Sequence, residues 1–195
     1  MIAQLVPVLF AFGANLGDRG ETIRAAQRAL AETPGIDRFA ASRLRETVAL
    51  TAAGPDPDAP RYLNGVATAC TTLDPHALLD AMQAIEAAHG RMRDTRWGDR
   101  TLDIDLVLFG GRVIADSRLQ VPHPRAHERD FVLAPWLDLD PNAVLMGHGR
   151  VADLLERVGD TTAPLRDDDG TDRTEAAGNR NGCTFDSTGG LDAQD

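Results

Sequence analysis

Apolar and acidic residues alternate in the stretch LDIDLVLF, from Leu102 to Phe109. Side chains of a β-strand point alternately to its two faces, so this alternation predicts a strand. The face turned to the core would carry Leu102, Ile104, Leu106 and Leu108. Asp103 and Asp105 would share the other face, with Cα atoms roughly 6.6 Å apart, twice the usual rise per residue. Any fold of this chain must therefore present two neighbouring carboxylates on one side of a buried strand.

Other segments predict the rest of a mixed fold. Helices should begin after Asp18, with Ile23, Ala26 and Leu30 as the apolar stripe, and at Asp74-Pro75, where aspartate caps and proline occupies the first turn. The second helix should bury Leu78, Leu79, Met82 and Ile85. Further strands are expected at 6–13, 38–49 and 62–72, a loop at 50–60, a hairpin from Gly110-Gly111 into 112–114, and short helices at 130–138 and 151–158. The order β-α-β-β-α-β predicts an α+β, ferredoxin-like antiparallel sheet with helices packed on both sides.

The chain divides into an apolar-patterned body, residues 1–162, and a tail, residues 163–195. Between Arg166 and Asp195 there are eight acids and three arginines, with Gly, Asp, Thr and Asn prominent. Such a segment cannot bury enough apolar surface to offset the entropy of ordering, so we expect it to be disordered. The body would be a single domain.

Composition excludes several classes of function. The formal net charge of −10 argues against nucleic acid or an anionic membrane as a partner. All 20 basic residues are arginine, which excludes a Walker-A loop and Schiff-base chemistry. Two distant cysteines, Cys70 and Cys183, predict neither a disulfide scaffold nor a cysteine zinc site, which is typical of the cytoplasm. We also expect the protein to be a monomer. His123 and His127 lack companions at metal-ligand spacing.

Four arginines precede the aspartate pair within ten residues: Arg91, Arg93, Arg96 and Arg100. Guanidinium groups match phosphate oxygens, and Mg²⁺ binds one or two carboxylates together with phosphate oxygens. The combination favours phosphoryl chemistry. The alternative is a surface network in which the arginines pair with Asp94, Asp99 and the two strand aspartates.

A series of motifs then occurs in order: FGANLGD at 12–18, ET at 46–47, YLN at 62–64, QAIE at 83–86, GRMRDTRWGDRTLDIDLVLF from Gly90, RLQVPHP from Arg118 and RDF from Arg129. Together they resemble the 6-hydroxymethyl-7,8-dihydropterin pyrophosphokinase family over about residues 6–160. The resemblance implies transfer of the β,γ-pyrophosphoryl group of ATP to the pterin hydroxymethyl group, with release of AMP, in folate biosynthesis.

The same resemblance implies roles for particular residues. Asp103 and Asp105 would hold two Mg²⁺ ions, and Arg91 and Arg100 would assist transfer. The pterin would lie between Tyr62 and Phe131. Its other contacts would come from Thr47, Val48, Leu50 and Asn64. ATP would be bound by Gln83, Glu86, Arg93, Trp97, Leu106, Arg118, Gln120, His123 and Arg129.

The sequence departs from the family pattern at a few positions, including Ala14, Val48-Ala49, Asp99 and Gln120. Two other functions therefore stay open. One is a nucleotidyltransferase, which would move AMP and release pyrophosphate. The other is a protein that binds nucleotide or pterin without catalysis.

Overall fold

The fold places the predicted strands and helices in the predicted order. The computed structural model describes residues 4–51, 54–56, 58–89 and 102–165. The ferredoxin-like unit consists of β1 (Val6–Ala14), α1 (Arg19–Ala31), β2 (Ile36–Ala41) with β3 (Arg45–Thr47), β6 (Tyr62–Thr71), α2 (Pro75–Ala88) and β7 (Asp103–Phe109). The main sheet is antiparallel, and β1 lies between β6 and β7. Both β2 and β3 pair with the far side of β6.

The two main helices begin where the sequence predicts. The Asp18 carboxylate accepts the Glu21 N–H at 3.0 Å at the start of α1. The Asp74 carboxylate accepts N–H groups from His76 and Ala77 at the start of α2. These side chains satisfy backbone donors that have no partner within the helix, which confirms the predicted helix starts.

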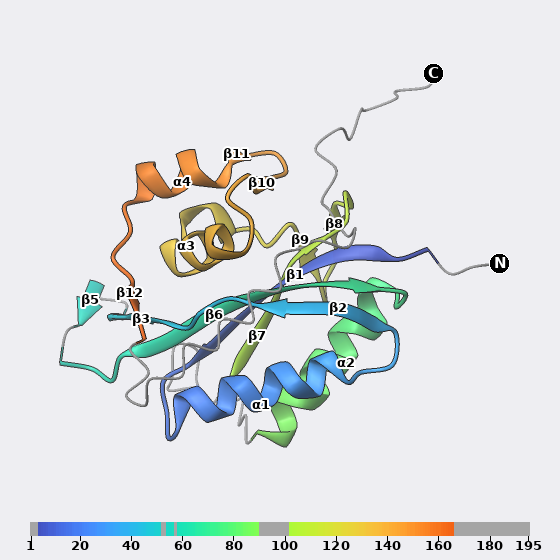
Figure 1. The fold of residues 1–195 in the computed structure, drawn as a ribbon, viewed down its shortest axis with the longest axis horizontal. Helices are drawn as coiled ribbons and strands as arrows, with labels where there is room; N and C mark the ends of the chain where they lie inside the picture. The colour runs from blue at the N-terminus through green and yellow to red at the C-terminus, as the bar shows by residue number, and fades with distance from the viewer. Residues whose placement is uncertain (1–3, 52–53, 57, 90–101, 166–195) are drawn as a thin grey trace.

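Helices cover both faces of the sheet, as Figure 1 shows. The α1–α2 core lies on one face and includes Phe10, Ile23, Leu63, Met82 and Leu106. On the other face lie η1 (Ala126–Glu128), α3 (Asp130–Leu139), the strands β10 (Val144–Leu145) and β11 (Gly149–Arg150), and α4 (Val151–Val158). The α3–α4 core on this second face includes Leu9, Val66, Leu108, Leu133 and Trp136. The expectation of helices on both sides is confirmed.

The strand predicted at 38–49 is wrong as one continuous element. Ser42 interrupts it, because its Oγ accepts the Val66 N–H at 3.0 Å while its own N–H donates to Val66 O. Leu44 then fills the space over Gly65, where a Cβ would lie 2.8 Å from Leu44 Cδ2. The chain resumes pairing as β3, so the glycine and the inward leucine produce the break.

Two predicted connections also differ. The segment 50–60, expected to be a loop, contributes to a small hairpin of β4 (Ala49–Thr51) and β5 (Gly54–Asp56). After the turn at Gly110, the expected return strand at 112–114 is wrong. Instead β8 (Ile114–Ala115) pairs with β9 (Gln120–Val121).

The alternation within β7 is interrupted by a bulge. Leu108 pairs with Leu9, but the next pair is Leu106 with Phe10, so Val107 is an extra residue. A bulge of this kind shifts the side chains that follow it to the opposite face. Leu108 therefore lies in the α3–α4 core and not with Leu106, contrary to the prediction.

Three further features bear on the predicted domain boundary, the cysteines and the membrane. β12 (Ala163–Pro164) pairs with β3, so the sheet takes in residues that the expected body–tail boundary assigns to the tail. Cys70 is fully buried and forms a disulfide bond, although the two distant cysteines predicted no disulfide scaffold; Cys183 lies outside the described residues. Among the described residues, none of the helices could span a membrane.

Candidate active site

The centre of the candidate site is a row of three residues across neighbouring strands. Gly13 on β1 pairs in register with Asn64 on β6 and with Asp103 on β7. The next row on the same face, two residues along each strand, joins Val66, Ala11 and Asp105 in the same way. Ala11 and Val66 belong to the α3–α4 core, so the alternation of strands places Asn64 and both aspartates on that face. The prediction that Asp103 and Asp105 share a face is confirmed.

Gly13 leaves space between the two polar ends of its row. A Cβ built on Gly13 would lie 3.2 Å from Asn64 Oδ1. Glycine inside a strand is typical of a place where another group approaches the backbone closely. Gly13 was not among the residues predicted for the site, although its position in an otherwise apolar strand was the available signal.

Asp105 is held by residues that come after the β8–β9 hairpin. Arg129 Nη1 donates to Asp105 Oδ2 at 3.2 Å, and His123 Nε2 lies 3.7 Å from the same oxygen. The bulge helps to set this arrangement, because the carbonyl of Val107 accepts the His123 N–H at 2.9 Å. Three residues predicted from separate motifs are therefore brought together.

His123 is mostly buried, and burial lowers its pKa below the ordinary value. The negative charge of Asp105 opposes this shift, whereas the Arg129 guanidinium adds to it. His123 Nδ1 accepts the Arg125 N–H at 3.2 Å, so the neutral ring carries its proton on Nε2. His123 Nε2 lies 3.7 Å from Asp105 Oδ2 and 3.5 Å from Arg129 Nη1.

A polar wall and an aromatic wall lie on this face. Asn64 Nδ2 donates to Thr47 Oγ1 at 2.8 Å, and both side chains are buried. Tyr62 pairs with Thr47 and, by alternation, shares the face of Asn64. Phe131 is at the start of α3, and the Arg129 guanidinium carbon lies 5.5 Å from the centre of its ring. Val48 follows Thr47 directly and is half-buried, whereas the side chain of Leu50 lies outside the described part of the chain.

Other residues predicted to contact ATP are dispersed around α2 and the β8–β9 hairpin. Glu86 is 2% exposed, and its Oε1 accepts the Ile104 N–H at 2.8 Å, so it fixes β7 from the opposite face. Leu106 is buried in the α1–α2 core, and Gln83 is half-buried on α2. Arg118 and Gln120 are exposed, and Arg118 forms an ion pair with Asp80 on α2. Leu106 therefore lies on the opposite face of β7 from the two aspartates, and Arg118 is turned toward α2.

The arginine-rich segment is beyond what the structure describes. Arg91, Arg93, Trp97 and Arg100 all lie within residues 90–101, outside the described residues. Their roles stay as the resemblance implies them.

A group of contacts around Arg45, which the sequence does not predict, joins β3 to α3. Its guanidinium binds both carboxylate oxygens of Asp138, at 3.0 and 3.2 Å, and also reaches Asp160 and Thr162. No local motif signals such contacts, since the partners lie more than 90 residues away along the chain.

Asp103 and Asp105 could supply part of the coordination sphere of a magnesium ion. Within residues 4–51, 54–56, 58–89 and 102–165, no group of three or more histidine, cysteine or acidic side chains forms a metal cage. Mg²⁺ seldom uses such a cage: it takes one or two carboxylates and completes its shell with water and substrate phosphates. Two half-buried carboxylates beside a glycine and an alanine satisfy that requirement.

Comparison with known proteins identifies the same family that the sequence motifs resemble. The profile of the family described as 7,8-dihydro-6-hydroxymethylpterin-pyrophosphokinase (HPPK) matches residues 9–141. A protein of Pseudomonas aeruginosa named 2-amino-4-hydroxy-6-hydroxymethyldihydropteridine pyrophosphokinase is 45% identical over 148 residues, which cover 76% of this chain and 89% of that protein. A Haemophilus influenzae protein of the same name is 35% identical over 156 residues, covering 80% of this chain and 95% of its own length.

Solved structures support the fold. The crystal structure of wild-type Plasmodium falciparum HPPK-DHPS with pteroate superposes with a TM-score of 0.59 at 14% identity. The match covers 79% of this chain but only 42% of that chain. At this identity the similarity shows the fold alone.

Proposed function

The chain belongs to the 7,8-dihydro-6-hydroxymethylpterin-pyrophosphokinase family, and we propose that it transfers pyrophosphate from ATP to 6-hydroxymethyl-7,8-dihydropterin in folate synthesis. The pterin hydroxyl oxygen forms a bond to the β-phosphorus of ATP. The bond between that phosphorus and the α,β-bridging oxygen breaks, AMP leaves, and the hydroxyl proton is released. The products are AMP and the pterin diphosphate.

One observation supports binding of the pterin at this site: Asn64 and Asp103 lie on either side of Gly13 in one row of the sheet. Two strand spacings separate their Cα atoms by roughly 10 Å. This span suits a bicyclic pterin whose amide-like edge meets Asn64 and whose hydroxymethyl group extends toward Asp103. Glycine in the middle leaves room for the ring.

The walls of the site would bind the flat pterin by complementary means. Tyr62 and Phe131 would cover the faces of the ring, since aromatic side chains pack well against flat conjugated groups. Asn64 and Thr47 would pair with donors and acceptors on its edge, with Val48 and Leu50 nearby. The existing Asn64–Thr47 hydrogen bond holds the amide in one orientation before the pterin binds.

Asp103 and Asp105 would hold Mg²⁺, two ions by the family resemblance, which would neutralise charge on the phosphate oxygens of ATP. Arg129, which contacts Asp105 in this structure, would donate to the same phosphates, and His123 Nε2 would donate beside it. Gln83, Glu86, Leu106, Arg118 and Gln120 would contact or support the nucleotide. Arg91 and Arg100 would assist transfer, and Arg93 and Trp97 would belong to the closing loop.

We also propose a domain organisation and a setting for the reaction. The body, residues 1–162, would be the catalytic domain, and residues 163–195 would form an acidic C-terminal tail. The protein would act as a monomer in the cytoplasm, where ATP is available. Its net charge of −10 supports small-molecule substrates over nucleic acid.

Identifying the products tests the function directly. The protein is incubated with Mg²⁺, ATP and hydroxymethyl-dihydropterin, and the products are resolved by ³¹P NMR and chromatography. We expect AMP and the pterin diphosphate in equal amounts, and no AMP when the pterin is left out. Release of pyrophosphate with a pterin–AMP adduct would identify a nucleotidyltransferase. Binding of both ligands without turnover would identify a non-catalytic protein.

A further inference from the structure

The segment Asp160–Leu165, which we call the strap, connects α4 to the edge of the main sheet (Figure 1). Within the strap, Ala163 and Pro164 pair with β3, and the Leu165 N–H donates to Leu44 O at 2.9 Å. Leu165 also packs against the α1–α2 core. The strap is therefore anchored at its end in the sheet, while its beginning passes beside α3.

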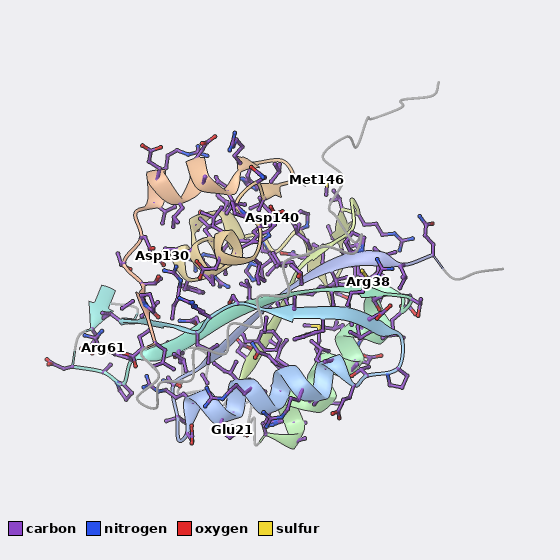
Figure 2. The ribbon with its side chains drawn as sticks, viewed as in Figure 1. Glu21, Arg38, Arg61, Asp130, Asp140 and Met146 are labelled. Carbon is purple, nitrogen blue, oxygen red and sulfur yellow. The ribbon has the colours of Figure 1, made fainter. Side chains whose placement is uncertain are left out.

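A single carboxylate joins the strap to the first turn of α3. Asp130 Oδ2 accepts two hydrogen bonds from Thr161, one from its N–H at 2.9 Å and one from its hydroxyl at 2.6 Å. Asp130 Oδ1 accepts the Phe131 N–H at 2.8 Å. Figure 2 shows Asp130 at the side of α3 that faces the descending strap. The Asp130 carboxylate therefore links Thr161 to the backbone of Phe131.

A second contact joins the strap, the far end of α3 and β3. Arg45 binds Asp138 with two hydrogen bonds, and its Nη1 reaches Asp160 at 3.3 Å and Thr162 Oγ1 at 3.0 Å. Its side chain is only 14% exposed, so these charges are partly shielded from solvent. Arg45 is two residues before Thr47 on β3, and both face α3.

We propose that the strap positions the two walls of the pterin site relative to each other. Asp130 and Arg45 are positioning residues: Asp130 fixes Phe131 and the preceding Arg129, and Arg45 fixes β3 with Thr47. This role rests on the proposed function, because it assigns Phe131 and Thr47 to pterin binding. Holding both walls before binding lowers the entropy that the ligand must otherwise remove.

Thr161 is the site of the most conservative test, because it is exposed and its replacement should leave the fold intact. Thr161→Val removes the hydroxyl donor but keeps the shape, and Thr161→Ser restores the donor. Thr72→Val serves as the matched control, since Thr72 is exposed at the opposite end of β6. Asp130→Ala is the stronger variant and removes both bonds to the strap. Hydrogen exchange of the free protein and steady-state kinetics are measured for all four variants.

We expect Thr161→Val to accelerate amide exchange in residues 129–134 and to raise the KM for the pterin about threefold to tenfold, the effect of one hydrogen bond. The kcat should change less than about twofold, because the reacting groups are untouched. Asp130→Ala should do more, Thr161→Ser should restore both values, and Thr72→Val should match the wild type. Faster exchange confined to residues 160–165, or an unchanged KM, would overturn the proposal.

The two proposals fail separately. A wild-type protein that forms no AMP would contradict the proposed function. The exchange of residues 129–134 in Thr161→Val and Asp130→Ala would still decide whether the strap holds Phe131 in place.

Discussion

Asn64 donates its side-chain amide N–H to the hydroxyl of Thr47 at 2.8 Å, across the paired strands β6 and β3. The two side chains are 5% and 7% exposed. This bond fixes which end of the amide is available beside Gly13, and the polar wall of the site depends on it.

Thr47→Val should therefore weaken pterin binding about threefold to tenfold, the net effect of one hydrogen bond. The amide of Asn64 loses its partner and can rotate, while nucleotide affinity should stay the same. Pterin binding is measured by titration calorimetry, with Thr47→Ser as the control that keeps the hydroxyl. Equal pterin affinity in the wild type and Thr47→Val would show that this hydrogen bond does not contribute to pterin binding.

Gly13→Ala tests the space at the centre of the row. The added Cβ would meet Asn64 Oδ1 at 3.2 Å, so the amide must shift by a few tenths of an ångström. Small displacements of binding groups have large effects, and we expect the pterin dissociation constant to rise threefold or more, on the order of what one hydrogen bond contributes. Gly111→Ala is the matched control, because no atom lies within 4 Å of its Cβ position. Unchanged pterin binding by Gly13→Ala would place the ligand elsewhere.

Local signals predicted much of this fold. The caps at Asp18 and Asp74 and the apolar stripes of α1 and α2 depend on residues a few positions apart, which sequence patterns report directly. The alternation of Ile104 with Asp103 and Asp105 likewise placed both carboxylates on one face.

Features that depend on distant contacts were not predictable in this way. The bulge at Val107 moves Leu108 to the other face because β7 must fit β1, and no residue within LDIDLVLF marks it. The break between β2 and β3 needs Leu44 to fill the space over Gly65, which is 21 residues further along the sequence. The contacts of Arg45 and Asp130 join segments that are adjacent only after folding.

Glu86→Ala should lower the free energy of unfolding by about 1–3 kcal/mol, because it leaves the Ile104 N–H buried without its acceptor. Glu86→Gln keeps an oxygen at that place and should lose less. Urea denaturation followed by tryptophan fluorescence measures both, and Glu156→Ala on the exposed face of α4 is the control. Wild-type stability in Glu86→Ala, together with a loss of ATP affinity, would show that Glu86 contacts the nucleotide without fixing β7.

His148 should titrate below its ordinary pKa. His148 is exposed, and the slight desolvation of its ring lowers its pKa; the neighbouring His127 and Arg157 lower it further, and the His127 and His148 rings stack with centres 4.0 Å apart. Because the unfolded chain takes up this proton first, His148 should reduce stability as the pH falls from about 6.5 to below its folded pKa. NMR titration should show the pKa of His148 rising in His127→Gln and unchanged in His89→Gln. A pKa of His148 at or above 6.5 would contradict this account.

The carboxylate pair of β7 is the part of the site on which the proposed transfer depends most. The most direct test is the rate of AMP formation by Asp103→Asn at saturating ATP, pterin and Mg²⁺, with Asp153→Asn on α4 as the matched control. Circular dichroism should give both variants the thermal midpoint of the wild type, since Asp103 faces away from the α1–α2 core. We predict that Asp103→Asn is at least about 100-fold slower than wild type and that Asp153→Asn is unchanged. A folded Asp103→Asn that forms AMP at the wild-type rate would show that this carboxylate has no part in the transfer.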